Sequence, residues 1–308
     1  LKVFLRGGHP RMIELPGPFG HEMSGTVVAS GGGVSGWAEG DAAVVVNSAS
    51  CAECDSCRAG RENLCEQLRY LNGAYADYLL VPELFVGRSS YRRPAGVDPA
   101  VAALAEPLAC VVHGLTLCGG VERGEAVVIG AGPIGLMFVA ELSRGGAQVI
   151  LGDIDPGRLE LGECIGVGRT VQLEGDEGDA QRLREATGGG RGAELTVDAT
   201  GTQMGWANAM EALRPGGTAL LFGGCPPGTT VAIDSHRIHY SEMTVRGAYH
   251  HRPATVEVAL EHLSGGDTGL EMLIQDEQPL DGVETALRRM AAREILKAAI
   301  RPHGGGDS

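Results

Sequence analysis

Positive charge is scarce in this sequence. Its 25 lysines and arginines face 39 aspartates and glutamates, which gives a formal net charge of −14. Because a nucleic-acid-binding protein needs a basic surface to neutralise phosphates, this balance argues against a nucleic-acid partner. A dinucleotide remains compatible with it, since a few backbone amides can hold its phosphates whatever the overall charge.

Long apolar runs are scarce as well. No stretch of about 18 uninterrupted apolar residues occurs, and the most apolar region, residues 127–140, is broken by glycine and proline. The start of the sequence has no signal-peptide pattern. We therefore expect no membrane partner and a cytoplasmic location. The 308 residues, 43% of them hydrophobic, suggest two domains with substantial cores.

The eight cysteines are unevenly spread, and four of them fall within residues 51–65. This crowding indicates a metal site in a reducing compartment rather than disulfides. The other four lie among apolar residues and are interpreted as small buried hydrophobes: Cys110, Cys118, Cys164 and Cys225. The crowded four have a spacing typical of a structural zinc loop, in which four thiolates leave no position for a substrate: Cys51, Cys54, Cys57 and Cys65.

An iron–sulfur cluster is the competing interpretation of this loop, because the first three cysteines share the bacterial ferredoxin spacing. That pattern places its fourth cysteine, followed by proline, where Arg61 and Glu62 stand. The sequence therefore favours zinc.

Residues 127–135 run an apolar strand into a glycine-rich turn and then into a helix, expected over Pro133–Arg144. In a dinucleotide cradle, Gly130 allows the tight turn, Gly132 admits the pyrophosphate and Gly135 lets the helix pack on the strand. A second apolar strand, residues 148–151, leads to Asp153, 23 residues after Gly130, where a carboxylate binds the ribose hydroxyls. A purely structural turn is the alternative, which this context disfavours.

Strands and helices alternate over residues 108–246, which predicts a doubly wound parallel sheet. The expected strands are residues 126–129, 148–151, 170–173, 194–197, 218–222 and 244–246, and the helices include 158–165, 180–186 and 204–213. Ligands bind at the carboxyl ends of such strands, so residues 198–201 and 223–224 are expected to line the crevice. The candidate cofactor-binding residues are Gly130, Gly132, Pro133, Ile134, Gly135, Asp153, Arg158, Thr200, Gly223 and Gly224.

The flanking regions are expected to form other structures. Residues 1–107 suggest a β-rich domain, with strands over residues 25–29, 43–46 and 75–81. Residues 247–308 suggest two helices and a strand, with a disordered tail over residues 304–308, and return to the first domain. The expected elements are the helices 255–263 and Val283–Ala291 and the strand 295–300.

Two short motifs carry weaker metal signals. His21 and Glu22 open the first expected strand, where an imidazole beside a carboxylate can bind zinc, although such a pair is more often a surface pair. Glu106 precedes Pro107 at the start of an apolar helix, where a carboxylate is favoured by the helix dipole even without a metal.

Taken together, these motifs resemble the zinc-dependent medium-chain alcohol dehydrogenases over nearly the whole chain. The Glu-Pro-Leu sequence at residues 106–108 is similar to the sorbitol and threonine dehydrogenase branch. The resemblance implies a GroES-like catalytic domain, a Rossmann cofactor domain, a homodimer or homotetramer, and hydride transfer between an alcohol or polyol and NAD. It also implies a catalytic zinc at His21 and Glu106 with Glu22 beside them.

The resemblance fails at the start of the sequence. The family takes a further zinc ligand from a Cys-Gly-Ser/Thr-Asp motif, which would lie just before residues 1–4, and His9 is a weak substitute because it lies in a turn-like segment. We therefore expect a weakened catalytic zinc site. A catalytically impaired or non-catalytic nucleotide-binding fragment is the alternative function, and a zinc-free quinone reductase ranks last.

Two further expectations concern specificity. Asp153 favours NAD over NADP, because a 2′-phosphate would be a like-charge contact. Arg158 could bind that phosphate, although in the resembling branch an arginine at this place accompanies NAD. Three polar residues follow the last sheet strand and suggest a polyol or sugar-like substrate: Tyr249, His250 and His251. Histidines that merely lie exposed in a loop would give the same sequence pattern.

Overall fold

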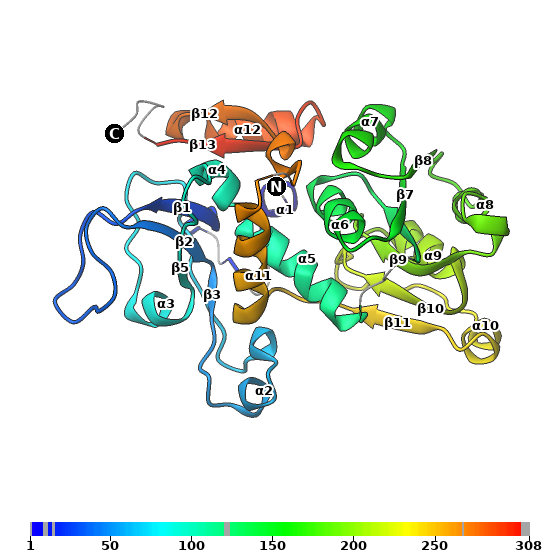
Figure 1. Ribbon diagram of the computed structural model, residues 1–308, viewed down its shortest axis with the longest axis horizontal. Helices are drawn as coiled ribbons and strands as arrows, with labels where there is room; N and C mark the ends of the chain where they lie inside the picture. Colours follow the sequence, from blue (N-terminus) through cyan, green and yellow to red (C-terminus); the bar gives the residue numbers. More distant parts are fainter. Residues whose placement is uncertain (1, 9–11, 14–15, 120–123, 267, 303–308) are drawn as a thin grey trace. The chain divides into compact units, whose positions relative to one another are not determined.

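The computed structural model describes residues 2–8, 12–13, 16–119, 124–266 and 268–302. His9, a weak substitute for the missing zinc ligand, and the tail 304–308, which was expected to be disordered, lie outside these residues. The chain forms two compact units (Figure 1). The first unit is Leu1–Cys110 together with His251–Ser308, and the second unit is Val111–His250.

The first unit is built around short strands. An antiparallel sheet has the order β1-β2-β5, and its strands are β1 (Glu22–Thr26), β2 (Ala42–Val46) and β5 (Ser90–Arg92). Two pairs accompany it: β3 (Ser48–Ala49) with β4 (Arg69–Tyr70), and the parallel pair β12 (Ile274–Gln278) with β13 (Lys297–Ile300). Its helices are α1 (Lys2–Arg6), α2 (Asp55–Arg58), α3 (Glu83–Arg88), α4 (Pro99–Ala102), α11 (Pro253–Ser264) and α12 (Val283–Ala291).

One strand expected from the sequence is wrong. Residues 75–81 form no strand; they follow a segment in which the amides of Gly73 and Ala74 donate to the distant Gly20 carbonyl. Their apolar side chains are still used, because Leu79 and Val81 pack against a cluster around the buried Phe85. The alternating pattern therefore predicted correctly that Leu79 and Val81 pack inward, but it predicted a paired strand that does not form.

The second unit contains a six-stranded parallel sheet with the order β11-β10-β9-β6-β7-β8 (Figure 1). The strands are β6 (Glu125–Ile129), β7 (Gln148–Asp153), β8 (Arg169–Gln172), β9 (Ala193–Asp198), β10 (Leu213–Leu221) and β11 (Thr244–Gly247). The helices α6 (Pro133–Arg144), α7 (Pro156–Ile165), α8 (Asp179–Glu185), α9 (Gln203–Glu211) and α10 (Ser235–Tyr240) alternate with them. The doubly wound sheet is confirmed. Strand order reverses beside β6, which is where ligands bind in such sheets.

The packing of α7 in the second unit shows that Cys164 is not buried. In α7, Leu159 and Gly162 face inward, and a Cβ on Gly162 would come within 2.3 Å of the Leu151 side chain. Cys164 lies on the outer face of the same helix and is exposed, so its interpretation as a buried hydrophobe is wrong. The other three isolated cysteines are partly buried.

One apolar helical stretch passes a length and composition test for membrane spans. It covers Pro99–Leu117, which contains α4 and α5 (Ala105–Leu117), and its mean hydropathy is 1.7. Of this stretch, 61% is buried inside the protein, as in the core helices of soluble proteins that pass the same test.

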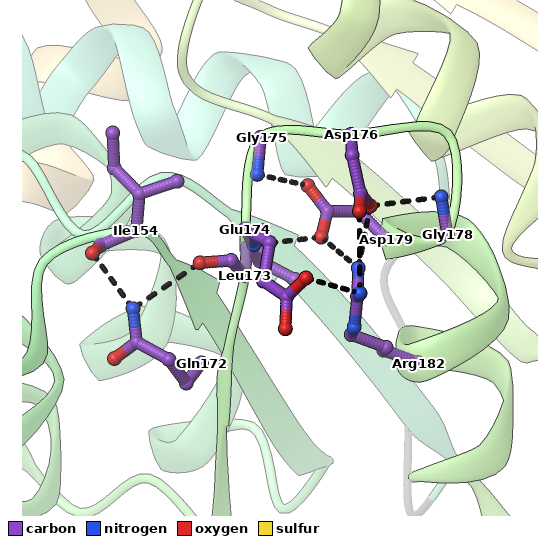
Figure 2. A network of polar contacts seen from close by, with 9 residues as sticks. All are labelled: Ile154, Gln172, Leu173, Glu174, Gly175, Asp176, Gly178, Asp179 and Arg182. Carbon is purple, nitrogen blue, oxygen red and sulfur yellow. Dashed lines mark hydrogen bonds and ion pairs between the residues drawn. The ribbon is translucent and has the colours of Figure 1, made fainter.

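A charged network closes the loop between β8 and α8 (Figure 2). The Arg182 guanidinium donates to Glu174, Asp176 and Asp179 over 2.6–2.7 Å. Asp179 is buried and also accepts the amides of Glu174 and Gly175, each over 2.9 Å. The neighbouring Arg182 holds the pKa of the Asp176 carboxyl below its usual value.

Candidate metal and cofactor sites

The first candidate site is the cysteine loop, whose four sulfurs the structure brings together. The Sγ atoms are 3.5 Å apart for Cys51 with Cys65 and for Cys54 with Cys57, and 3.9 Å apart for Cys51 with Cys57 and Cys54 with Cys65. Zinc–sulfur bonds of about 2.3 Å in a tetrahedron require sulfurs about 3.8 Å apart. The four thiols therefore fit a zinc ion.

The backbone of the loop prepares these sulfurs for a cation. The amides of Cys51 and Gln67 donate to Cys65 Sγ, and the amide of Cys54 donates to Cys51 Sγ, each over 3.3 Å. Backbone donors from Glu66 and Cys57 lower the pKa of Cys54 to about 6. Burial raises the pKa of Cys57 to about 12 in the metal-free loop. Such N–H···S contacts favour thiolates, the form that binds metal.

The second candidate site joins residues far apart in the sequence, all in the first unit. His21 and Glu22 stand at the start of β1, and Glu106 lies in the first turn of α5. One ligand atom from each lies within 4.8 Å of the other two. Nitrogen and carboxylate donors at this separation fit a Zn²⁺ site.

Two more side chains surround this trio. Lys297 Nζ lies 2.5 Å from a Glu22 carboxylate oxygen, and His251 Nε2 lies 3.9 Å from Glu106 Oε1. No sequence pattern indicated the Lys297 contact, and His251 was suggested only as a polar residue near a polyol. Both contacts join residues well over a hundred positions apart, so no local pattern could have revealed them.

The electrostatics of the two carboxylates differ. Burial, and then the charge of Glu22, raise the pKa of Glu106 to about 8. Burial also acts to raise the pKa of Glu22, but the charges of Lys297 and His21 outweigh it and the pKa is lowered. Without a metal, Glu106 thus holds a proton at neutral pH and Glu22 is ionised.

The third candidate site is the glycine-rich turn of the second unit. Gly130 has a φ of +101°, and a Cβ on Gly135 would lie 1.7 Å from the Gly130 carbonyl oxygen. In the described part of the chain, no atom lies within 4 Å of the position where Gly132 would carry a Cβ. Pro133 and Ile134 then open α6, whose first amides have no partner inside the helix. The turn fits a dinucleotide pyrophosphate.

Asp153 lies at the end of β7 beside this turn. Its carboxylate accepts the amides of Ala131, over 2.5 Å, and Asp155, over 2.9 Å. Arg158 is close to another acid, with its Nε 3.8 Å from Asp155 Oδ2. Backbone N–H donors therefore orient the carboxylate of Asp153, the residue predicted to bind the ribose hydroxyls. Arg158 is paired with Asp155 instead.

The remaining candidates follow two neighbouring strands: Thr200 comes after β9, and Gly223 and Gly224 come after β10. Buried Asp198 accepts the Thr200 hydroxyl over 2.6 Å, and its main-chain carbonyl accepts the Gly223 amide. A Cβ on Gly223 would clash with the Gly201 backbone, whereas Gly224 faces open space. Trp206, which sequence reasoning did not include, donates its indole N–H to the Gly223 carbonyl.

Comparison with known proteins shows which family shares this architecture. Residues 2–89 match the family model for the alcohol dehydrogenase GroES-like domain, and residues 133–265 match that for zinc-binding dehydrogenases. The chain is 30% identical over 306 residues to L-galactonate-5-dehydrogenase of Escherichia coli (strain K12), covering 96% of this chain and 86% of the relative. It is 34% identical over 275 residues to D-altritol 5-dehydrogenase of Agrobacterium fabrum (strain C58 / ATCC 33970), covering 85% and 76%.

Solved structures agree with these relatives. Alcohol dehydrogenase TADH from Thermus sp. ATN1 has a TM-score of 0.86 at 26% identity, covering 98% of this chain and 89% of that one. A zinc-binding dehydrogenase homologue from Sinorhizobium meliloti 1021, solved with NADP bound, has a TM-score of 0.83 at 28% identity, covering 93% and 83%. The GroES-like and Rossmann-type folds are those of an oxidoreductase. The chain belongs to the zinc-binding, medium-chain alcohol dehydrogenase family.

Proposed function

We propose that this protein transfers a hydride between a secondary alcohol group of a polyol and NAD, with zinc as the metal. The observation that carries the proposal is the trio of His21, Glu22 and Glu106, with donor atoms within 4.8 Å of one another. Galactonate and altritol, which two relatives name as their substrates, are both polyhydroxylated.

In this proposal His21 and Glu106 hold a catalytic zinc, and Glu22 lies beside them in its ion pair with Lys297. When bound, zinc polarises the alcohol oxygen and lowers its pKa. Metal binding requires Glu106 to lose the proton that burial otherwise holds there. The four cysteines of the loop hold a second, structural zinc.

NAD is the proposed cofactor because of Asp153. Its carboxylate is fixed by two backbone amides, so a 2′-phosphate at the same place would meet a like charge. Arg158 pairs with Asp155, which reduces its availability for such a phosphate. A homodimer or homotetramer is the proposed assembly, implied by the family resemblance alone and testable by light scattering.

Turnover together with metal content tests the proposal. Zinc would be measured by elemental analysis, and NADH formation would be followed with a panel of polyols that includes D-altritol and L-galactonate. Glu106→Gln is expected to lower kcat/KM by at least about 100-fold, the loss typical of a residue that positions reacting groups, while the exposed Glu177→Gln control keeps full activity. Binding of NAD without turnover of any polyol would instead favour a non-catalytic nucleotide-binding protein.

A further inference from the structure

An open cleft of about 620 Å³ lies in the second unit, and arginines dominate its lining. The residues that line it are Arg184, Gly190, Arg191, Arg214 and Pro215. Arg184 comes from α8, Gly190 and Arg191 from the segment before β9, and the other two from the start of β10. Among the described residues, no acidic side chain lines the cleft. In a chain with a net charge of −14, the cleft is therefore a local concentration of positive charge.

The cleft lies at the edge of the sheet opposite to the candidate cofactor site. Leu213, the first residue of β10, pairs with Ala193, the first residue of β9, and the cleft residues flank these two positions. The cofactor candidates Thr200 and Gly223 follow the other ends of the same two strands. Because a strand rises about 3.3 Å per residue, the six residues of β9 span roughly 17–20 Å between the two edges. The cleft is therefore separate from the glycine-rich turn.

Main-chain oxygens hold Arg184 in place. Its guanidinium donates to the Leu213 carbonyl over 2.7 Å, and to the carbonyls of Glu211 and Arg191 over 3.2 Å each. The Glu211 carboxylate itself pairs with Arg237. A guanidinium has five N–H groups, so these carbonyls fix the orientation of Arg184 and leave donors over. They also leave its positive charge without a carboxylate partner in the described part of the chain.

Arg191 has the most unused donors in the cleft. It is exposed, and its Nε donates to the Gly188 carbonyl over 3.4 Å. The described residues offer no acceptor to its four terminal N–H groups. Acids in the adjoining segments bind other groups, since Glu194 pairs with Arg214 over 2.9 Å and Glu125 accepts the Gly188 amide. Two of the three arginines thus present charge and donors to the cleft without a carboxylate.

We propose that this cleft binds a small anion that carries at least two phosphate groups. Its volume lies within the range of about 300–1,000 Å³ that is typical of small-molecule sites. The planar fork of an arginine matches phosphate oxygens, and a terminal phosphate has three of them, so several guanidinium groups can share one phosphate. A carboxylate has two oxygens, which a single fork already matches. A nucleic acid is disfavoured as the ligand, because the rest of this acidic chain repels it.

Calorimetric titration of the zinc-loaded protein with inorganic pyrophosphate tests this inference, which does not depend on the activity proposed above. Arg191→Gln should keep the fold, because the side chain is exposed and has no carboxylate partner. It is expected to weaken pyrophosphate binding by about 10- to 100-fold, as for loss of charge-assisted hydrogen bonds. Arg58→Gln is the matched control, since it removes the same charge from a side chain that is 71% exposed and 4.0 Å from Asp55; it should leave binding unchanged.

Three further titrations complete the test. Inorganic phosphate, with one phosphate group, and malonate, with two carboxylates, should bind more weakly than pyrophosphate. Added NAD should leave pyrophosphate binding in place; displacement by NAD, with no effect of Arg191→Gln, would assign the pyrophosphate to the glycine-rich turn. That result would overturn the inference, as would equal binding of malonate or equal losses in the Arg191 and Arg58 variants. Pyrophosphate binding that only Arg191→Gln weakens supports the inference even if no polyol is turned over, in which case only the proposed function fails.

Discussion

Lys297 and Glu22 form an ion pair of 2.5 Å although 275 residues separate them in the sequence. The lysine side chain is 16% exposed and the glutamate 31%, so water screens the pair only in part. The pair fixes the strand β13 to the start of β1, beside His21. It therefore links the candidate metal site of His21, Glu22 and Glu106 to the stability of the first unit.

Replacement of Lys297 by methionine is expected to destabilise the protein by about 1–2 kcal/mol, because it leaves the Glu22 carboxylate half-buried and unpaired. Urea denaturation of metal-free protein near neutral pH measures this. Arg58→Met is the control: Arg58 is exposed and lies 4.0 Å from Asp55, so the loss there should be close to zero. Equal losses in the two variants would contradict a special role for the Glu22 pair.

The raised pKa of Glu106 predicts a dependence of stability on pH in metal-free protein. The carboxyl has a pKa of about 8 when folded and 4.5 as an ordinary glutamate. The folded state therefore binds the proton more tightly, and its contribution is complete below pH 4.5 and lost as pH rises to about 8. Each unit of pKa difference corresponds to about 1.4 kcal/mol.

Denaturation at a series of pH values tests this, with Glu106→Gln as the reference because it keeps the shape and cannot titrate. The difference in stability between the two proteins should change in favour of the glutamine variant as pH rises through this window. A difference that stays flat would show that Glu106 titrates normally.

The cysteine loop should react unevenly once zinc is removed. With a pKa of about 6, Cys54 is mostly thiolate near neutral pH, whereas Cys57, with a pKa of about 12, is not. Brief alkylation of chelator-treated protein, read by mass spectrometry, should therefore label Cys54 before Cys57. Added zinc should protect both, and preferential labelling of Cys57 would contradict the ordering.

Removal of the Asp153 carboxylate should change cofactor preference. Asp153→Ser is expected to raise KM for NAD by about tenfold or more, since a charged hydrogen bond is lost, and to improve the use of NADP relative to NAD. Steady-state kinetics with both cofactors measures the ratio. Glu163→Gln on α7 is a suitable control, since that side chain contacts Thr170 and should leave the ratio unchanged.

The network in Figure 2 predicts a stability effect distant from the candidate sites. Asp179→Ala removes the acceptor of two backbone amides and of Arg182, so it should destabilise the second unit by about 1–3 kcal/mol. Thermal unfolding should show this loss while kcat/KM of the remaining folded protein for a polyol is unchanged. Glu185→Ala, an exposed change at the end of the same helix, should have little effect.

Features whose residues are close together in the chain could be predicted from the sequence. The glycines of the cradle and the spacing of the cysteines each lie within one turn or loop, so local geometry alone brings their atoms together. The six parallel strands followed from apolar runs at regular intervals. In these cases the residues that form the sequence pattern are the same residues whose local geometry forms the structure.

Features that depend on tertiary pairing could not be predicted. Residues 75–81 alternate like a strand, and Leu79 and Val81 do pack against an apolar cluster, but the backbone of this stretch pairs with no strand. The ion pair between Lys297 and Glu22 likewise has no sequence pattern, because 275 positions separate the two residues.

The division of the first unit into two segments also constrains how the protein is made. Residues 251–308 complete that unit, yet Val111–His250 leave the ribosome before them and form a unit of their own. During synthesis the second unit can fold first, before the residues that complete the first unit, including Lys297, which pairs with Glu22 on β1, have been made. Until Lys297 has been synthesised, the Glu22 carboxylate lacks its ion-pair partner, so the first unit is completed only after the whole of the second unit has been made.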